Sequence, residues 1–195
     1  MSNPHPLHGL TTATHTPFHP DGSLNLSVVE AQASHLLNQG VGAVFIGGTT
    51  GESHSLTVQE RLALAERWTD VVQGSPLRVV VHVGGNCLAD ARTLAAHAAG
   101  RGAAAIAALA PSYFKPRSLD LLIACCADIA AAAPETPFYF YDIPVLTGVA
   151  FSMPDRGLQS ARREAQPTAP EGSVAALASL RSSRAPMVNT RALGR

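Results

Sequence analysis

Two short stretches of the sequence carry residues that could hold and protonate an anionic substrate. The first, GGTTGES at 47–53, places Thr49 and Thr50 beside Gly48 and two other glycines, so two hydroxyls stand next to backbone N–H groups that no bulky side chain shields. Such a set of donors suits a carboxylate. An ordinary strand-to-helix turn also uses glycine and threonine, and the spacing alone leaves both interpretations open.

The second stretch, FYFYDIPVLTG at 138–148, begins with a run of aromatic residues. Tyr139 and Tyr141 share one face of an extended segment, because the side chains of a strand alternate between its two faces. Tyr141 falls at the exit from the strand, where a tyrosine with a pKa tuned toward neutrality could act as a general acid or base. More often such a tyrosine packs its ring and hydrogen-bonds its hydroxyl, so this alternative also stays open.

One lysine, Lys115, occurs in the whole chain, in the stretch PSYFKPRS at 111–118. A lone amine raises the question of covalent chemistry, because a desolvated lysine can form a Schiff base with a ketone. Pro116 and Arg117 indicate an exposed turn, where water keeps the amine protonated. The sequence therefore predicts that Lys115 is not a nucleophile.

The bulk composition describes a globular protein with neither a nucleic-acid nor a membrane partner. The formal net charge is zero, 46% of the residues are hydrophobic and 14% are charged. No run of about 20 apolar residues could span a membrane, and the amino terminus lacks the pattern of a signal peptide. Three cysteines, two of them adjacent, suit neither a disulfide framework nor zinc. We therefore expect reduced core thiols, no metal and a cytoplasmic location.

Apolar segments alternate with amphipathic ones over the first 150 residues. The sequence predicts strands at 9–18, 41–48, 77–85, 103–110 and 136–144 and helices at 27–40, 57–72, 87–102 and 118–133. This rhythm indicates βα units and a parallel sheet. No GxGxxG or phosphate-loop motif is present, so we expect a (β/α)₈ barrel of the TIM type. A complete barrel takes about 250 residues and carries its chemistry at the carboxyl ends of the strands.

The βα rhythm stops after the fifth predicted strand. Residues 1–153 carry seven Lys and Arg against eleven Asp and Glu, whereas residues 154–195 carry seven Arg against three acids and no aromatic residue. Arg, Ala, Ser and Pro dominate the second segment, a composition typical of disorder. We therefore expect a barrel truncated to about five of its eight βα units at 1–153 and a disordered tail at 154–195. Scattered charges without aromatics for stacking disfavour a nucleic-acid tail.

In combination, GGTTGES and the later YDIPVLTG resemble the N-acetylneuraminate lyase and dihydrodipicolinate synthase family of class I aldolases. GLTTATHTPFHPDGSLN at 9–25 and APSYFKP at 110–116 belong to the same resemblance, which runs over residues 7–152. It implies a (β/α)₈ barrel, a homotetramer built from dimers and a small-molecule substrate, pyruvate or N-acetylneuraminate. It also implies catalysis through a lysine Schiff base, with neither a cofactor nor a metal.

The resemblance implies a role for each matching residue. Thr49 and Thr50, with Gly48 beside them, match the pair that holds the substrate carboxylate, and Thr49 also joins a proton relay. Tyr141 matches the catalytic tyrosine that moves the proton at the substrate hydroxyl during carbon–carbon cleavage. Tyr113 matches a tyrosine that lies near the active site at the dimer contact.

Two departures from the family pattern affect the expected activity. The synthase branch has an arginine two residues after the position of Pro144, and this chain has Leu146 there, which favours the lyase branch. The family's Schiff-base lysine lies downstream of the tyrosine, where this chain reads PTAPEGSVAA at 167–176. Lys115 matches a non-catalytic position, so we expect an inactive chain of the N-acetylneuraminate lyase type. The alternatives are a non-enzymatic isoform that associates with full-length subunits, or another pyruvate-dependent keto-sugar-acid aldolase.

Overall fold

The computed structural model describes residues 7 and 9–151, whose strands form one parallel sheet. The strands are β1 (Thr11–Ala13), β2 (Ala43–Ile46), β3 (Arg78–His82), β4 (Ala105–Ala108) and β5 (Phe138–Phe140). Each strand pairs in parallel with the next one along the chain, so the spatial order equals the sequence order. Parallel neighbours cannot be joined by a hairpin and require a crossover.

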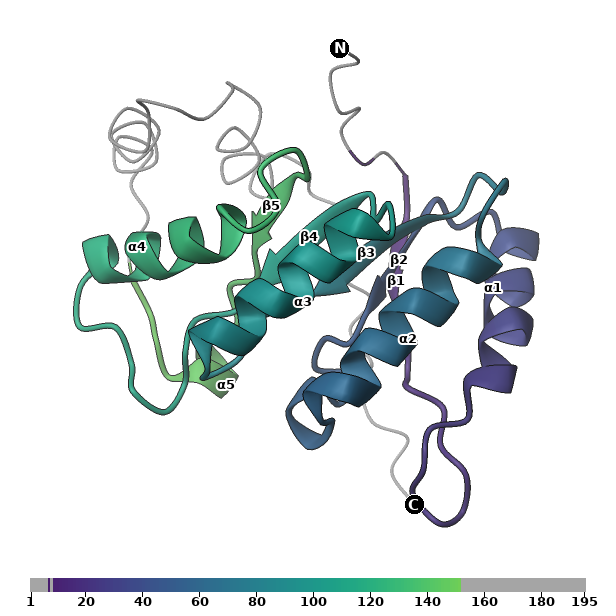
Figure 1. The fold of residues 1–195 in the computed structure, drawn as a ribbon, viewed down its shortest axis with the longest axis horizontal. Helices are drawn as coiled ribbons and strands as arrows, with labels where there is room; N and C mark the ends of the chain where they lie inside the picture. The colour runs from purple at the N-terminus through teal and green to yellow at the C-terminus, as the bar shows by residue number, and fades with distance from the viewer. Residues whose placement is uncertain (1–6, 8, 152–195) are drawn as a thin grey trace.

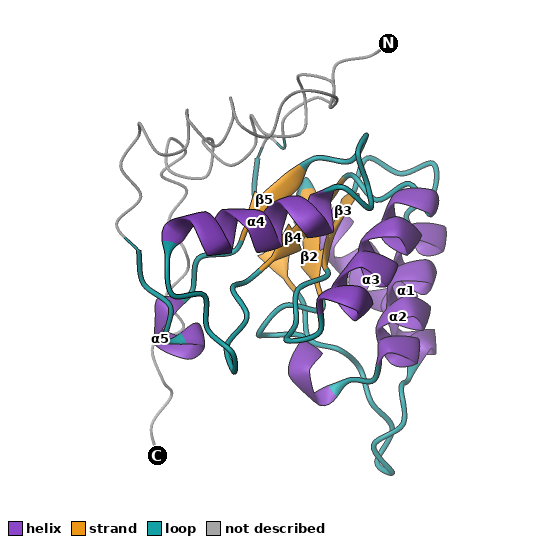
Figure 2. Ribbon diagram, turned by 60° about the vertical axis from the view of Figure 1, so that its left-hand side comes forward, coloured by secondary structure: helices purple, strands orange, loops and turns teal. Residues whose placement is uncertain are grey.

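Helices supply these crossovers. They are η1 (Leu26–Val28) with α1 (Val29–Asn38), η2 (Ser53–Ser55) with α2 (Val58–Val71), α3 (Leu88–Gly100) and α4 (Leu119–Ala130), and a single turn, α5 (Pro144–Thr147), follows β5. Figures 1 and 2 show α1 to α4 in a row over one face of the sheet. A doubly wound sheet has helices on both faces and a reversal of strand order. An unbroken order with helices on one face is the arrangement of a barrel wall, as the sequence predicts.

Local signals explain where the helices begin. The Thr57 hydroxyl accepts a hydrogen bond from the backbone N–H of Glu60, and the Glu60 carboxylate accepts one from the backbone N–H of Thr57. This reciprocal pair is the capping box that the sequence predicts, and it satisfies two donors that a helix start would otherwise leave free. Ser118 caps α4 in a simpler way, by accepting from the N–H of Leu121.

The main hydrophobic core lies between the helices and the sheet. Its largest fully buried side chains include Trp68, Leu94, Ile106 and Phe138. A second, smaller cluster occupies the opposite face, which in a barrel is the interior. It contains Val80, Ala105 and Ala107, with Leu7, Phe45 and Tyr139 packed against them. Both faces of the sheet are therefore covered, which explains why the strands are apolar at successive positions.

The sequence-based prediction overestimates the length of the strands, and it is wrong about residues 144–147 and about Cys87. Every strand is shorter than predicted, because its ends belong to the loops at the two edges of the sheet. Residues 144–147, partly included in the fifth predicted strand, form α5, since proline suits the first turn of a helix. Cys87 is exposed at the start of α3 and is not a core thiol, whereas Cys126 is buried; all three thiols are free.

Three expectations concern features outside the sheet. Within the described residues, no helix is long and apolar enough to cross a lipid bilayer. The same part of the chain contains no group of three or more His, Cys, Asp or Glu side chains placed to hold a metal ion. The predicted tail at 154–195 lies outside the described residues, so its disorder and the boundary at 153 stay predictions.

Candidate active site

The carboxyl end of the sheet brings together two of the residues singled out in the sequence. The hydroxyls of Thr49, which follows β2, and Tyr141, which follows β5, lie 3.2 Å apart and share a hydrogen bond. The two residues are 92 positions apart in the chain. They meet because all five strands run in the same direction, so every strand exit lies at one edge.

The glycines of the loop at 47–53 allow the chain to pack against itself. A Cβ on Gly48 would lie 2.5 Å from the ring of Phe45, and one on Gly51 would lie 2.9 Å from the backbone nitrogen of Gly47. Gly47 itself has a φ of +60°, a conformation that L residues rarely adopt. Close packing within the chain therefore requires glycine at positions 48 and 51. The expected approach of a ligand to this loop stays a prediction.

The conformation of Glu52 is strained. Its φ is 55°, and no other described non-glycine residue has a positive φ. Such strain costs about 1–3 kcal/mol and is concentrated at functional sites. The Glu52 carboxylate makes no capping hydrogen bond to η2, and the Glu52 backbone carbonyl instead accepts from the N–H of Ser55 at 2.8 Å.

Thr49 and Thr50 are both exposed at the surface of this loop. The Thr49 carbonyl accepts a hydrogen bond from the N–H of Glu52 at 3.1 Å, which closes a turn. No described residue accepts a hydrogen bond from the N–H groups of Thr49, Thr50 or Gly51. Hydroxyls and unpaired backbone N–H groups on a tight turn are the types of donor that anion-binding turns use.

Three aromatic rings meet directly beside the Thr49–Tyr141 hydrogen bond. The centroid of the Tyr141 ring lies 5.4 Å from that of Phe45 and 5.9 Å from that of His82, and the Phe45 and His82 centroids are 6.1 Å apart. Each pair is nearly perpendicular, with interplanar angles of 80–82°. Edge-to-face contact at this spacing is favourable.

His82 is the functional candidate that sequence reasoning missed. The residue falls within the predicted strand at 77–85, and the sequence analysis assigns it no role. The side chain is 1% exposed, and burial, reinforced by the positive charge of Arg61, lowers the pKa of His82 to about 3. The imidazole is therefore neutral at physiological pH. A histidine at the end of an apolar strand is the signal that could have identified it.

Arg61, in the first turns of α2, holds the exit of β3. Its Nη2 atom donates to the carbonyl oxygens of His82 at 2.9 Å and of Gly84 at 3.0 Å. Burial lowers the pKa of Arg61 to about 10, an effect that Asp90 opposes. The guanidinium thus remains charged and fixes the backbone that carries His82.

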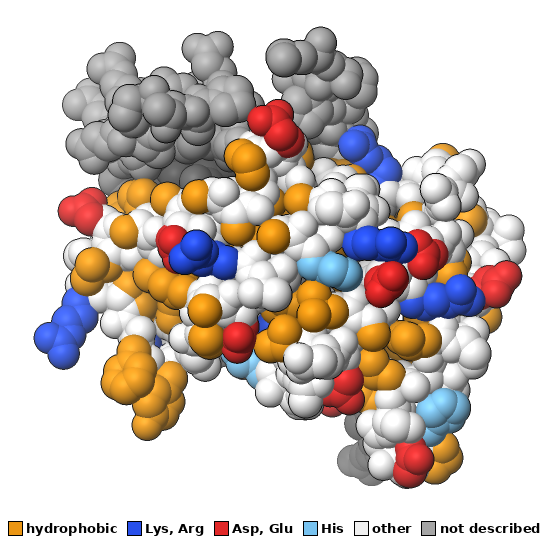
Figure 3. Space-filling view, viewed as in Figure 1, with side chains coloured by type: hydrophobic (Ala, Val, Ile, Leu, Met, Phe, Trp, Pro, Cys, Tyr) orange, Lys and Arg blue, Asp and Glu red, His pale blue; other side chains and the backbone are white. Residues whose placement is uncertain are grey.

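Tyr113 is not brought to the Thr49–Tyr141 pair within this chain. It lies in the loop after β4, where the Asn86 side-chain oxygen accepts hydrogen bonds from the N–H groups of Ser112 at 2.8 Å and Tyr113 at 2.9 Å. Tyr113 is 78% and Phe114 87% exposed, and their rings meet edge to face. Figure 3 shows an apolar protrusion where this loop leaves the body of the molecule. The predicted role of Tyr113 at a dimer contact stays a prediction.

Lys115 is exposed, as predicted, and lies against the turn that follows β5. A Cβ built on Gly148 would lie 2.5 Å from the Lys115 Nζ atom and 3.3 Å from its Cε atom. Gly148 ends α5 in a left-handed conformation. The amine therefore sits at the carboxyl end of a helical turn, where positive charge is favourable.

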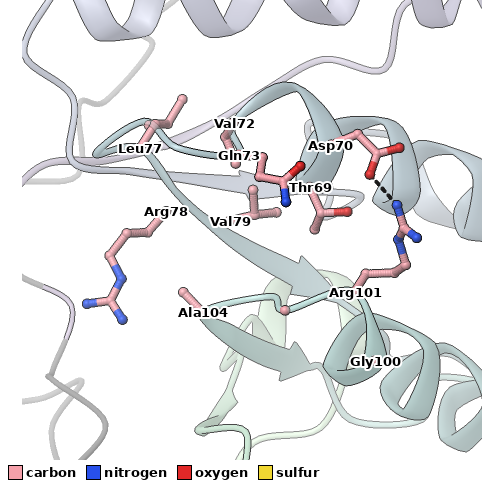
Figure 4. Close-up of a pocket in the computed structure, with 11 residues that line it drawn as sticks. Thr69, Asp70, Val72, Gln73, Leu77, Arg78, Val79, Gly100, Arg101 and Ala104 are labelled. Atoms are coloured by element: carbon pink, nitrogen blue, oxygen red, sulfur yellow. Dashed lines mark hydrogen bonds and ion pairs between the residues drawn. The ribbon is translucent and has the colours of Figure 1, made fainter. Parts of the chain in front are cut away.

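Two cavities open at opposite ends of the sheet. The one at the carboxyl end has a volume of about 310 Å³ and includes Thr49, Ser53 and Leu146 in its lining. The larger one, about 660 Å³, lies where β3 and β4 begin (Figure 4). There Arg101 forms ion pairs with Asp70 and Glu66. Barrel chemistry takes place at the carboxyl ends of strands, so the smaller cavity is the candidate site.

Comparison with known proteins identifies the family to which this chain belongs. A model of the dihydrodipicolinate synthetase family matches residues 6–155. N-acetylneuraminate lyase B of Xenopus laevis is 45% identical over 148 residues, which are 75% of this chain and 56% of that protein. N-acetylneuraminate lyase of Gallus gallus is 46% identical over 144 residues, 73% of this chain and 47% of that one. The chain therefore spans about half the length of the curated relatives it matches.

Solved structures agree with the sequence comparison. The N-acetylneuraminate lyase of Proteus mirabilis superposes with a TM-score of 0.73 and 38% identity, covering 78% of this chain and 51% of that one. A dihydrodipicolinate synthase matches with a TM-score of 0.71 at 27% identity. Because the family match covers most of the chain and the fold agrees, the chain belongs to the dihydrodipicolinate synthetase family.

Proposed function

We propose that this chain carries the carboxylate-binding and proton-transfer part of an N-acetylneuraminate lyase site. The observation that supports this most directly is the 3.2 Å hydrogen bond between Thr49 and Tyr141 at the carboxyl end of the sheet. The free donors of the loop at 47–53 provide a place for a carboxylate beside that bond. Relatives at about 45% identity carry the name of this activity.

The proposed chemistry assigns each group one step. In a complete site, a lysine amine attacks the ketone of open-chain N-acetylneuraminate and forms an iminium with loss of water. Thr49 and Thr50 hold the neighbouring carboxylate. Tyr141, through Thr49, accepts the proton of the C4 hydroxyl while the C3–C4 bond breaks, and the electron pair of that bond passes into the iminium. The products are N-acetylmannosamine and an enamine that is protonated and hydrolysed to pyruvate.

These 195 residues do not include a lysine suited to that first step. Lys115 is the one lysine of the sequence, and its exposed amine lies against Gly148 at the end of α5. A Schiff-base lysine is activated by a desolvated pocket or by a neighbouring group, and the exposed loop that carries Lys115 provides no such pocket. We infer that the chain by itself binds the keto acid without cleaving N-acetylneuraminate.

A second function, association with full-length lyase subunits or with further copies, has its own support. Tyr113, Phe114 and Val145 are each at least 78% exposed, and Leu146 is 57% exposed. Large apolar side chains grouped around one end of a molecule mark interaction surfaces. This surface is consistent with the oligomers expected from the family resemblance.

The test combines a covalent and a non-covalent measurement. The chain is incubated with pyruvate and borohydride, digested and mapped by mass spectrometry, while release of N-acetylmannosamine from N-acetylneuraminate is assayed in parallel. We expect neither an adduct nor product above background. An adduct on Lys115, with product formation that disappears in Lys115→Ala, would overturn the proposal.

Pyruvate binding is then measured by saturation-transfer NMR. We expect Thr49→Val and Thr50→Val to weaken binding at least fivefold, because each removes a hydroxyl from the donor set. Thr93→Val serves as the matched control, since Thr93 is also an exposed threonine but lies on α3. Equal binding by all three variants would contradict the proposed carboxylate site.

A further inference from the structure

His82 is the buried titratable group closest to the candidate site, and the proposed chemistry gives it no part. Within the described residues, neither of its ring nitrogens has a hydrogen-bond partner. The imidazole is therefore not linked to the Tyr141 hydroxyl or to Thr49 as a proton carrier. Its contacts with the site are made by the ring, against Tyr141 and Phe45.

We propose that His82 is a positioning residue that holds the Tyr141 ring where its hydroxyl reaches Thr49. The inference rests on the proposed function, in which Tyr141 moves the substrate proton. A ring displaced by a single rotamer change would carry the hydroxyl several ångströms away from Thr49. Catalytic groups need to be held far more tightly than that.

The position of Tyr141 in the chain explains why it needs support. Tyr141 lies one residue beyond the end of β5 and is half-buried. Its backbone N–H donates to the Ala108 carbonyl at 2.9 Å, which fixes the backbone. This bond does not fix the side chain, and the ring contacts with Phe45 and His82 are what restrict it.

His82 is itself held on several sides. Arg61 fixes its carbonyl oxygen, and β3 pairs it with Ala107 of β4. Ala107 lies between His82 of β3 and Tyr139 of β5 in the sheet. Its small methyl group leaves space above β4 for the rings on either side. A Cβ on Gly84 would lie 3.0 Å from the His82 Nε2 atom. The imidazole therefore has little freedom to move away from Tyr141.

The charges that face His82 favour a neutral ring. Arg61 approaches from α2 and His54 from η2, and both charges lower the pKa of His82, whereas the Gly47 backbone raises it. Because the ring stays neutral over the physiological pH range, its edge-to-face contacts with Tyr141 and Phe45 do not change with pH. This behaviour is what a positioning residue requires.

Fluorine NMR can observe the Tyr141 ring without any substrate. The chain has three tyrosines, so uniform 3-fluorotyrosine labelling gives one signal for each, and Tyr141→Phe assigns the signal of Tyr141. We expect His82→Leu, which keeps the volume but removes the aromatic ring, to move that signal toward that of exposed Tyr113. His82→Phe restores an aromatic ring at this position, so the Tyr141 signal should stay close to its position in the native chain.

Two further variants separate positioning from general loss of packing. Val83→Ala removes buried atoms at the neighbouring position on the helix side of the sheet, and it should lower stability without moving the Tyr141 signal. Phe45→Leu removes the other ring contact and should move the signal as His82→Leu does. A Tyr141 signal that stays in place in His82→Leu, or moves equally in Val83→Ala, would overturn the proposal.

A pyruvate titration of the same samples distinguishes this inference from the proposed function. If His82 positions Tyr141 for the substrate, pyruvate should shift the Tyr141 signal in the native chain and in His82→Phe, and at least fivefold less in His82→Leu. If pyruvate shifts no tyrosine signal in the native chain, the proposed function fails while the substrate-free comparison still decides the positioning role.

Discussion

Acidification should destabilise this protein through His82, and the structure determines both the direction and the size of the effect. Burial and the charge of Arg61 lower the pKa of His82 from 6.5 to about 3 in the folded chain. Between these two values the unfolded chain binds a proton that the folded chain does not. The contribution of the neutral imidazole is therefore fully present above pH 6.5 and is lost as the pH falls toward 3.

The size follows from the two pKa values. A difference of one proton changes the free energy of unfolding by about 1.4 kcal/mol per pH unit. Between pH 7 and pH 4, the unfolded histidine becomes almost fully protonated, whereas the folded one is only about one-tenth protonated. The expected loss is about 3 kcal/mol, a large part of the roughly 5–15 kcal/mol that stabilises an ordinary domain.

Urea unfolding followed by tryptophan fluorescence can measure this loss. Trp68 is the one tryptophan of the chain and is fully buried, so its emission reports on the core. The native chain is compared with His82→Leu from pH 7 to pH 4. The pKa of Asp21 is lowered by hydrogen bonds from Ser23, and its acid response cancels in the difference because both chains share it.

The difference between the two chains is the decisive quantity. We expect the free energy of unfolding of the native chain, relative to that of His82→Leu, to fall by about 3 kcal/mol between pH 7 and pH 4. Below pH 6 the slope should be close to about 1.4 kcal/mol per pH unit. Parallel stability curves would show that His82 titrates normally in the folded chain. The reasoning from its burial would then be refuted.

Four other substitutions test three separate features of the fold. Thr57→Ala should cost about 1 kcal/mol in urea unfolding, because it removes the side-chain cap of α2. Gly48→Ala should lower the free energy of unfolding by about 1–3 kcal/mol, since its Cβ must displace the Phe45 ring. Gly100→Ala is the matched control, because its Cβ would meet no atom within 4 Å, and it should be neutral or slightly stabilising. Tyr113→Ser should reduce self-association in sedimentation velocity, because it removes an exposed ring from the apolar protrusion.

Much of the architecture can be predicted from the sequence because its signals are local. The period of apolar residues marks each helix, and the Thr57–Glu60 capping box marks the start of α2 to the residue. Alternation of βα units implies parallel strands, and parallel strands place their exits at one edge. That reasoning alone puts Thr49 and Tyr141 at the same end of the sheet, where the structure finds their hydroxyls 3.2 Å apart.

Other features depend on which side chains meet across strands, and no local pattern encodes that. The register that pairs His82 with Ala107 leaves room above β4, and only then can rings from β2, β3 and the exit of β5 come together. The position of the Lys115 amine against Gly148 likewise depends on two loops that converge in space. The sequence determined the elements and the shared edge, whereas tertiary packing decided the environment of each side chain there, because burial and contact depend on the register of the whole sheet.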